Sequence, residues 1–422
     1  MIEIFPIETY DILLLSAGLA ILLTALLPDL LEDRLITIPI FYLILSGIIF
    51  GFILDIDVRH FAEGPYLAKR ITELAVIISL TGVGLKINRP FDKKTWSISS
   101  RLLIVTMPIT ILLMALMGWW FLGFLPATAV LLGAVVAPTD PVLAEEVQTT
   151  PPLQEDVLST QVGLTTEAGL NDGLAFPFTN MAIAIAFAGI APTGWFMEWP
   201  LVDFLYKIAV GTMVGLLIGW FLGKLLYSLP RPKVRKSNIS IGILALSLTL
   251  IPYGVAEILS SYGFIAVFVA ACAFRYLESE HEYLPNLHDL SEQMEQILVL
   301  VVFLLIGIYL TSGFIHDFQW YMIPAALATI FLIRPVSGLL GLIDISLPLE
   351  KKMVISFFGI RGVGSVYYLM YALYHADFQA AGEVLALVTV IIIVSVVVHG
   401  ILAKTAVKWV QRVKNRKDTG EL

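Results

Sequence analysis

The stretch LTTEAGLNDGLAFPF, residues 164–178, places two acids, Glu167 and Asp172, in a run that is otherwise apolar or weakly polar. No other Asp, Glu, Lys or Arg occurs between Val157 and Glu198. Such a run is typical of a segment that crosses a bilayer, which takes about 20 apolar residues. An ionisable group in hydrocarbon is costly unless it is paired or hydrated, and it marks a functional site by default. The stretch therefore predicts a membrane helix with functional carboxylates.

The rest of the chain has the same character. Of its 422 residues, 58% are hydrophobic and 14% are charged, which excludes an ordinary soluble domain. The first apolar run has no basic flank, so we expect it to be retained as a span. We predict an all-α polytopic membrane protein with about thirteen transmembrane helices. Their approximate limits are 11–28, 37–54, 70–86, 98–121, 125–147, 157–188, 201–229, 238–258, 262–276, 294–312, 319–343, 351–374 and 382–408.

The distribution of Lys and Arg predicts the orientation, because these residues gather on the cytoplasmic side of a membrane. With an outside N-terminus, twenty of the 26 lie in inner connections or the C-terminal tail, and four lie outside. The other two, Arg334 and Arg361, fall within spans. We expect a multi-pass protein of the plasma (inner) membrane with a cytoplasmic C-terminus and a short tail at residues 414–422.

Two predicted spans are interrupted near their centres. In the fifth, APTDP places Pro138 and Pro141 on either side of Thr139 and Asp140, and proline removes a helical hydrogen bond and strains the preceding turn. In the twelfth, GIRGVG surrounds Arg361 with glycines. Irregular backbone at this depth is tolerated only where it lines a protein-walled or watery cavity. The breaks therefore point to a binding site.

The two interrupted spans lie seven apart, so they cross the membrane in opposite directions. This arrangement predicts inverted repeats, a hallmark of secondary transporters. Residues 1–229 form the first repeat (spans 1–6) with a linking span 7, and residues 238–413 form the second (spans 8–13). We expect two crossing broken helices at the centre of the fold.

Among the ionisable residues inside predicted spans, five stand out, namely Asp140, Glu167, Asp172, Arg334 and Arg361. On a helix, Glu167 and Asn171 share a face, whereas Asp172 points elsewhere. We expect a buried ion pair between Glu167 and Arg361 that supports the fold. Asp172 is then left to bind something cationic.

A lone carboxylate in a poorly hydrated cavity favours its protonated form, yet it can release the proton to a small cation that oxygen ligands stabilise. Asn171, Thr139 and Asp140 offer such oxygens. Proton and cation then compete for one negative site. If one charge is neutralised in each cycle, one proton exchanges for one monovalent cation, which favours electroneutral exchange.

The motifs APTDP, EAGLNDG, RPVS and GIRGVGSVYYL resemble the monovalent cation:proton antiporter-1 family, which includes the NhaP-type antiporters and their NHE relatives. The resemblance covers the whole chain in motif order. It implies that Asp172 binds the ion and the proton, that Asn171 marks electroneutral members and that Thr139 coordinates Na⁺ with Asp172. It also implies that Asp140 balances helix ends and that Glu167 pairs with Arg361.

The same resemblance implies a homodimer in which a mobile core bundle moves against a dimerisation bundle. We assign spans 4–6 and 11–13 to the core bundle and the remaining spans to the dimerisation bundle. The expected cargo is a monovalent cation and a proton, and we expect no cofactor and no nucleic-acid partner.

The chain departs from the family pattern in two places. Many members carry serine after the glutamate, where this chain has Ala168, so Thr166 or water is a candidate replacement ligand. Some members carry a third acid in the third span, and the corresponding SLTGVGLKIN has none. Glu73 lies about three turns earlier and is a weaker candidate.

We predict a Na⁺ (or Li⁺)/H⁺ antiporter that serves pH homeostasis, not an enzyme, with a K⁺/H⁺ antiporter of the same architecture as the alternative. A passive cation channel is the alternative from another class, since it also uses intramembrane carboxylates. An intramembrane aspartyl protease is disfavoured because its GxGD pattern is absent, and the six histidines have no HExxH-like spacing.

A glycine ridge, GTMVGLLIGWFLG, repeats glycine every four positions from Gly211 to Gly223. Small residues at this spacing allow two helices to approach closely. The ridge fits either a dimer contact or packing within one chain.

Overall fold

The computed structural model describes residues 38–49, 64–87, 93–140, 159–191, 195–228, 238–277 and 284–418, together with Gly18 and Leu22. Over these ranges the chain is almost entirely helical and has no strand, which confirms the all-α prediction. In the described part, five helices are long and apolar enough to cross a bilayer. The predicted first span, 11–28, lies almost wholly outside these residues, so the count of thirteen stays a prediction.

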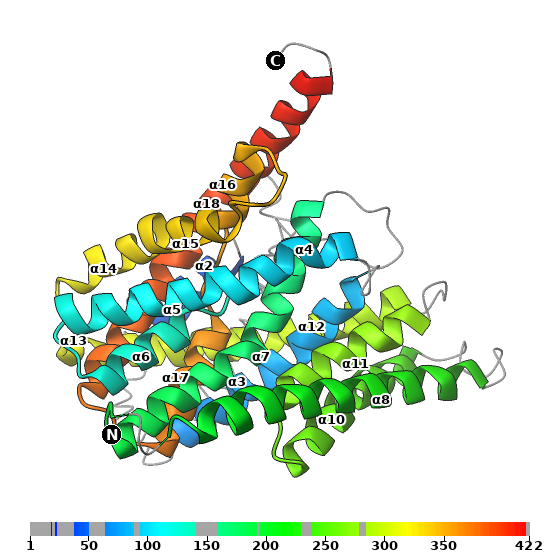
Figure 1. Cartoon of the computed structure of the whole chain (residues 1–422), viewed down its shortest axis with the longest axis horizontal. Helices are drawn as coiled ribbons and strands as arrows, with labels where there is room; N and C mark the ends of the chain where they lie inside the picture. Colours follow the sequence, from blue (N-terminus) through cyan, green and yellow to red (C-terminus); the bar gives the residue numbers. More distant parts are fainter. Residues whose placement is uncertain are drawn as a thin grey trace, which may run out of the picture.

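One group of helices packs around α3 and α11. It consists of α2 (Ile38–Ile49), α3 (Gly64–Lys86), α8 (Lys207–Ser228), α10 (Asn238–Ile258), α11 (Gly263–Leu277) and α12 (Leu284–Ser312). A π-helical segment, η7 (Trp199–Tyr206), leads into α8. In Figure 1, α8, α10 and α11 run side by side.

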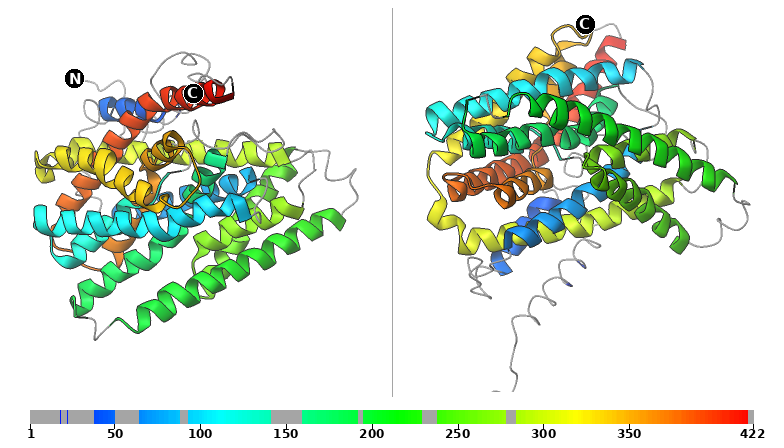
Figure 2. Two further views of the ribbon diagram at one scale, coloured as in Figure 1. Left: turned by 45° about the horizontal axis from the view of Figure 1, so that its top comes forward. Right: turned by 60° about the horizontal axis from the view of Figure 1, so that its bottom comes forward.

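A second group packs around α6, α7 and α17. Its first part is α4 (Lys93–Arg101), η3 (Leu102–Thr106), α5 (Met107–Leu116), η4 (Met117–Phe121), α6 (Pro126–Val136) and α7 (Ser159–Ala188). Its second part follows a short α13 (Phe314–Asp317) and is α14 (Met322–Ala328), η8 (Thr329–Ile333), α15 (Arg334–Gly341), α16 (Leu349–Phe357), α17 (Val363–His375) and α18 (Ala381–Asp418). The groups meet where α3 contacts α17 and α7, and where α11 contacts α7. Figure 2 shows the same two groups from other sides.

Most predicted boundaries lie within a few residues of the helices, because long apolar runs end at charged residues or prolines. Four helices extend further than predicted. The helices α3, α4 and α12 begin at Gly64, Lys93 and Leu284 instead of 70, 98 and 294, and α18 continues to Asp418 instead of 408. The extensions contain polar or charged residues, so hydropathy alone ends the span where the apolar run ends.

The glycine ridge of α8 packs against α11 within the same chain. A Cβ on Gly215 would lie 2.5 Å from the carbonyl oxygen of Ala266, and one on Gly219 would collide with the backbone of Ala270. The opposite side of α8 exposes large apolar side chains, including Leu217 and Phe221. The ridge is therefore an intramolecular contact, and the exposed apolar side chains suit a hydrocarbon surrounding.

Candidate functional site

The second broken helix has the predicted form. The helix α16 ends at Phe357 and α17 begins at Val363, with non-helical backbone between them. The first break begins where α6 ends at Val136, and the chain is irregular through Asp140. Pro141 and the rest of that predicted span, to residue 147, lie outside the described residues.

The two breaks lie against each other through backbone hydrogen bonds. The N–H of Asp140 donates to the carbonyl oxygen of Ile360 at 2.7 Å. The N–H of Val363, the first residue of α17, donates to Oδ2 of Asp140 at 2.7 Å. A carboxylate in this position satisfies a helix N-terminus and its partial positive charge.

Arg361 serves the opposite helix end. Its guanidinium donates to the carbonyl oxygens of Ala137 and, at 2.8 Å, of Pro138, just past the C-terminus of α6. A helix C-terminus carries partial negative charge and unpaired carbonyls, so a buried cation is well placed there. Arg361 is 1% exposed and is held by the broken-helix backbone.

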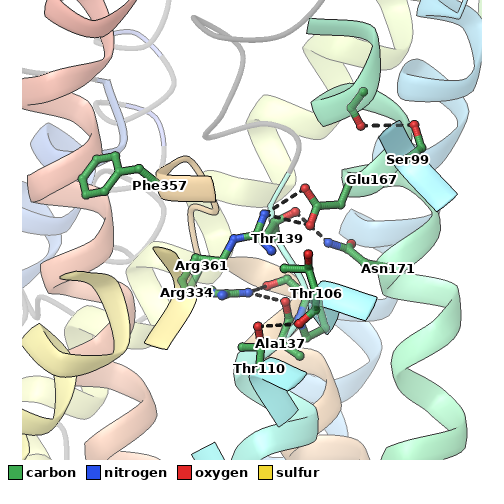
Figure 3. Close-up of polar contacts among 12 residues, drawn as sticks. Ser99, Thr106, Thr110, Ala137, Thr139, Glu167, Asn171, Arg334, Phe357 and Arg361 are labelled. Atoms are coloured by element: carbon green, nitrogen blue, oxygen red, sulfur yellow. Dashed lines mark hydrogen bonds and ion pairs between the residues drawn. The ribbon is translucent and has the colours of Figure 1, made fainter. Parts of the chain in front are cut away.

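The predicted ion pair between Glu167 and Arg361 is wrong. Glu167 pairs with Arg334, whose Nη2 lies 2.8 Å from Oε1 and 2.9 Å from Oε2 of Glu167, and both side chains are buried. Figure 3 shows these side chains converging between the helices. Both arginines lie inside apolar segments, so the sequence shows that each needs a partner but not which helix faces α7. The guanidinium of Arg361 is engaged by the carbonyls after α6.

Local sequence explains how Arg334 reaches Glu167. Pro335, which lacks an N–H, follows Arg334 at the start of α15, and a π-helical turn, η8, precedes it. Gly359 provides the room, because a Cβ there would lie 2.5 Å from Nε of Arg334. The RPVS motif and the glycine-rich break thus fit together around one buried guanidinium.

Asp172 lies in a small cavity at the boundary between the two helix groups. The cavity is lined by Ala75, Val76, Ser79, Asp140, Asp172, Val299, Val363 and Gly364. Asp172 is 2% exposed, and its Oδ1 has no hydrogen-bond partner among the described residues. None of the described basic residues forms an ion pair with it. The carboxylate is therefore available to a proton or a cation.

Two residues of α17 define the surroundings of Asp172. A Cβ on Gly364 would lie 2.6 Å from Oδ1 of Asp172, so only glycine allows this approach of backbone to carboxylate. The hydroxyl of Tyr368 donates to the backbone oxygen of Asp172. One turn along α7, Phe176 packs its ring against an aromatic cluster of Tyr262, Phe264, Tyr367, Tyr368 and Tyr371. This cluster joins α7, α11 and α17 next to the site without lining the cavity itself.

Asn171 and Thr139 are joined directly. Nδ2 of Asn171 donates to Oγ1 of Thr139 at 2.7 Å, which links α7 to the first break. Oδ1 of Asn171 is buried and has no described hydrogen-bond partner. Thr166 is fully buried on α7 but does not line the cavity of Asp172. Its predicted role as a ligand stays a prediction.

Ser79 is the residue that sequence reasoning missed. Its Oγ is buried, lines the cavity and has no hydrogen-bond partner in the described part of the chain. Glu73 lies elsewhere, since it accepts from Arg70 at 2.7 Å and from the hydroxyl of Tyr253. Ala75, Val76 and Ser79 share one face of α3 by their spacing, but a lone serine does not mark that face until the cavity is known.

Chemically, the site gathers buried oxygens without a fixed cation. Oδ1 of Asp172 and Oγ of Ser79 line the cavity and are the kind of hard donors that alkali cations prefer, whereas Oδ1 of Asn171 is buried but does not line it. A buried acceptor left unsatisfied is costly, so a bound cation or proton relieves that cost.

Comparison with known proteins places this geometry in context. Residues 18–409 match the family model described as sodium/hydrogen exchanger, transmembrane. The chain is similar in fold to the sodium proton antiporter MjNhaP1 from Methanocaldococcus jannaschii, with a TM-score of 0.73 and 19% sequence identity. The match covers 94% of this chain and 98% of that one.

Curated relatives are similar in sequence as well. The K(+)/H(+) antiporter NhaP of Alkalimonas amylolytica is 24% identical over 83% of this chain and 58% of its own length. The Na(+)/H(+) antiporter 2 of Zygosaccharomyces rouxii is 26% identical over 70% of this chain and 38% of its own length. The chain thus spans about half the length of these relatives.

Proposed function

The chain belongs to the sodium/hydrogen exchanger family, and from this premise we propose that it exchanges Na⁺ or Li⁺ for H⁺ across the plasma membrane. The observation that carries the proposal is the buried carboxylate of Asp172, whose Oδ1 has neither a hydrogen-bond donor nor a basic partner among the described residues. Asp140 also lines the cavity, but its carboxylate accepts from the N–H of Val363 at the start of α17, which leaves Asp172 to exchange its charge. One exchanging carboxylate accepts one proton or one monovalent cation, so we propose electroneutral exchange, one for one.

The cation is held by Asp172 together with Thr139, Asn171 and Ser79. Asp140 and Arg361 hold the two broken helices against each other, and the buried Glu167–Arg334 pair joins α7 to α15 beside them. The site changes the side of the membrane to which it is open when it holds either ion. The empty site keeps a negative charge in the protein interior, and this charge opposes the change. Because cation and proton compete, the cation concentration for half-maximal rate rises as pH falls. We further propose a homodimer that serves pH homeostasis.

K⁺/H⁺ exchange is the second candidate. A relative that covers 83% of the chain is named a K(+)/H(+) antiporter, whereas the solved structure of similar fold is named a sodium proton antiporter. The names of these proteins differ in the cation, and the oxygens around Asp172 accept either ion.

The deciding experiment uses purified protein in liposomes with an internal pH dye and an imposed pH gradient. Wild type is expected to move protons on addition of Na⁺ or Li⁺ and more weakly with K⁺. Asp172→Asn is expected to abolish the signal, whereas Asp344→Asn, an exposed acid on the same protein, retains it. Proton movement that persists in Asp172→Asn would contradict the proposal. Cation flux without opposing proton movement would indicate a channel.

A further inference from the structure

The break between α16 and α17 leaves backbone groups without helical partners in the protein interior. Phe358, which directly follows the last residue of α16, has extended dihedral angles, φ −74° and ψ 99°. Within a membrane, each such group needs a partner from the protein because water is absent. The helix α18 supplies two of these hydrogen-bond partners.

Ser395 and His399 lie one turn apart on α18, and both are buried. The backbone N–H of Arg361 donates to Oγ of Ser395 at 3.0 Å. Nε2 of His399 lies 3.1 Å from the carbonyl oxygen of Phe357, the last residue of α16. The two side chains therefore hold both ends of the unwound stretch.

Both ring nitrogens of His399 face acceptors. Nε2 lies 3.1 Å from the carbonyl oxygen of Phe357, and Nδ1 lies 2.8 Å from the backbone oxygen of Ser395 and 3.2 Å from its Oγ. A hydrogen on Nε2 donates to Phe357 and ties α18 to the end of α16, whereas a hydrogen on Nδ1 donates to the backbone of Ser395 within α18. Oγ of Ser395 accepts from the N–H of Arg361.

We propose that Ser395 and His399 are positioning residues that set the cation affinity of the site through the second break. The proposal rests on the proposed function. When α18 fixes the backbone of Arg361, it also fixes the neighbouring residues that meet the ion site. Val363 reaches Asp140, and Gly364 lies against Asp172. Neither Ser395 nor His399 lines the cavity, so both act at a distance through the chain.

The test measures the cation concentration for half-maximal exchange, the maximal rate and the pH profile in liposomes. Ser395→Ala and His399→Leu are expected to raise that concentration about tenfold, since one lost hydrogen bond corresponds to about 1.4 kcal/mol. Ser395→Thr and His399→Gln keep a hydroxyl and a donor and are expected to stay within about threefold of wild type. Thr389→Val is the matched control, because this buried hydroxyl bonds only within α18.

Normal half-maximal concentrations in folded Ser395→Ala and His399→Leu would overturn the proposal. If His399→Leu yields no folded protein, Ser395→Ala carries the same test. A pH profile of His399→Gln that differs from that of wild type would also overturn the proposal, because a positioning role uses the donor at Nε2 and not a change in the charge of the ring. Failure of wild type to exchange any cation would instead refute the proposed function, so the two failures are distinguishable.

Discussion

At the residue scale, the buried carboxylate of Glu167 forms its ion pair with Arg334 and not with Arg361. Two charges in the interior lose their hydration, and close geometry with the right counter-ion offsets that loss. Arg334 makes contacts at 2.8 and 2.9 Å with the two carboxylate oxygens. Arg361 is engaged instead with carbonyls at the end of α6. Arg334 therefore neutralises a buried carboxylate, and Arg361 binds the carbonyl groups that follow a helix C-terminus.

This pairing predicts that the coupling free energy from a double-mutant cycle is large for Glu167 with Arg334 and small for Glu167 with Arg361. Glu167→Gln or Arg334→Gln alone is expected to destabilise the protein by about 3–5 kcal/mol, because each leaves a buried charge alone. The double variant is expected to lose less than the sum, and thermal unfolding in detergent measures the difference. Glu167→Gln combined with Arg361→Gln is expected to be closer to additive. Strong coupling to Arg361 with none to Arg334 would contradict the pairing.

Ser79 carries a second prediction at this scale. Ser79→Ala removes one neutral oxygen from the cavity and is expected to raise the cation concentration for half-maximal exchange about tenfold. Thr72→Val is the control, since this buried hydroxyl on the same helix is already bonded to Ala68 and Lys69. Proton binding at Asp172 does not need Ser79. Equal effects of the two variants on cation affinity would argue against Ser79 as a ligand.

At the scale of elements, α8 and α11 depend on glycine for their close contact. Any side chain at Gly219 meets the backbone of Ala270, which cannot move without shifting α11. The helix α8 thus has one face of exposed apolar side chains and one face of glycines, with Val214 and Leu222 buried beside them. Helix approach of this kind is driven by close packing, because lipid is as apolar as the helices themselves.

The ridge predicts opposite effects of two alanine substitutions. Gly219→Ala is expected to lower the unfolding temperature in detergent, because the new methyl group collides with Ala270. Gly254→Ala on α10 meets open space and is expected to be neutral or stabilising, since alanine favours a helix by about 1 kcal/mol over glycine. If the Gly219→Ala protein unfolds at the same temperature as wild type, α8 and α11 do not approach as closely at Gly219 and Ala270 as the structure shows.

The broken helices show what a sequence can predict about elements. Proline pairs and glycine clusters mark where a helix stops, so the break around Arg361 was predictable from GIRGVG alone. The residues that contact each break were not predictable, because they come from α6, α15 and α18, which lie far from the breaks in the sequence or on the other broken helix. Ser79 was missed for the same reason: a lone serine in a helix has no pattern, and only the cavity gives it meaning.

At the scale of the whole molecule, the ion site lies between two groups of helices. Ser79 on α3 and Val299 on α12 come from one group, whereas Asp172 on α7 and Gly364 on α17 come from the other. A movement of one group against the other would therefore change both the ligand set and the access to Asp172. Apolar composition and span length predict such a bundle, but the meeting of the groups depends on contacts far apart in sequence.

If Asp172 alone exchanges its charge while Asp140 stays bound to the N-terminus of α17, exchange occurs without net current. In liposomes with a fixed ion gradient, clamping the membrane potential with valinomycin and K⁺ on both sides is expected to leave the Na⁺-driven proton flux unchanged. Electroneutral exchange moves one charge in each direction, so voltage does no work on it. A rate that follows the imposed voltage would require a second titrating group and would contradict the one-for-one count.

The central claim, that one carboxylate takes either a proton or a cation, is tested most directly by proton release from purified protein in weakly buffered detergent. Addition of Na⁺ or Li⁺ to wild type at a pH where Asp172 is protonated is predicted to release about one proton per chain, and Asp172→Asn is predicted to release none. Equal release from both proteins would contradict the claim.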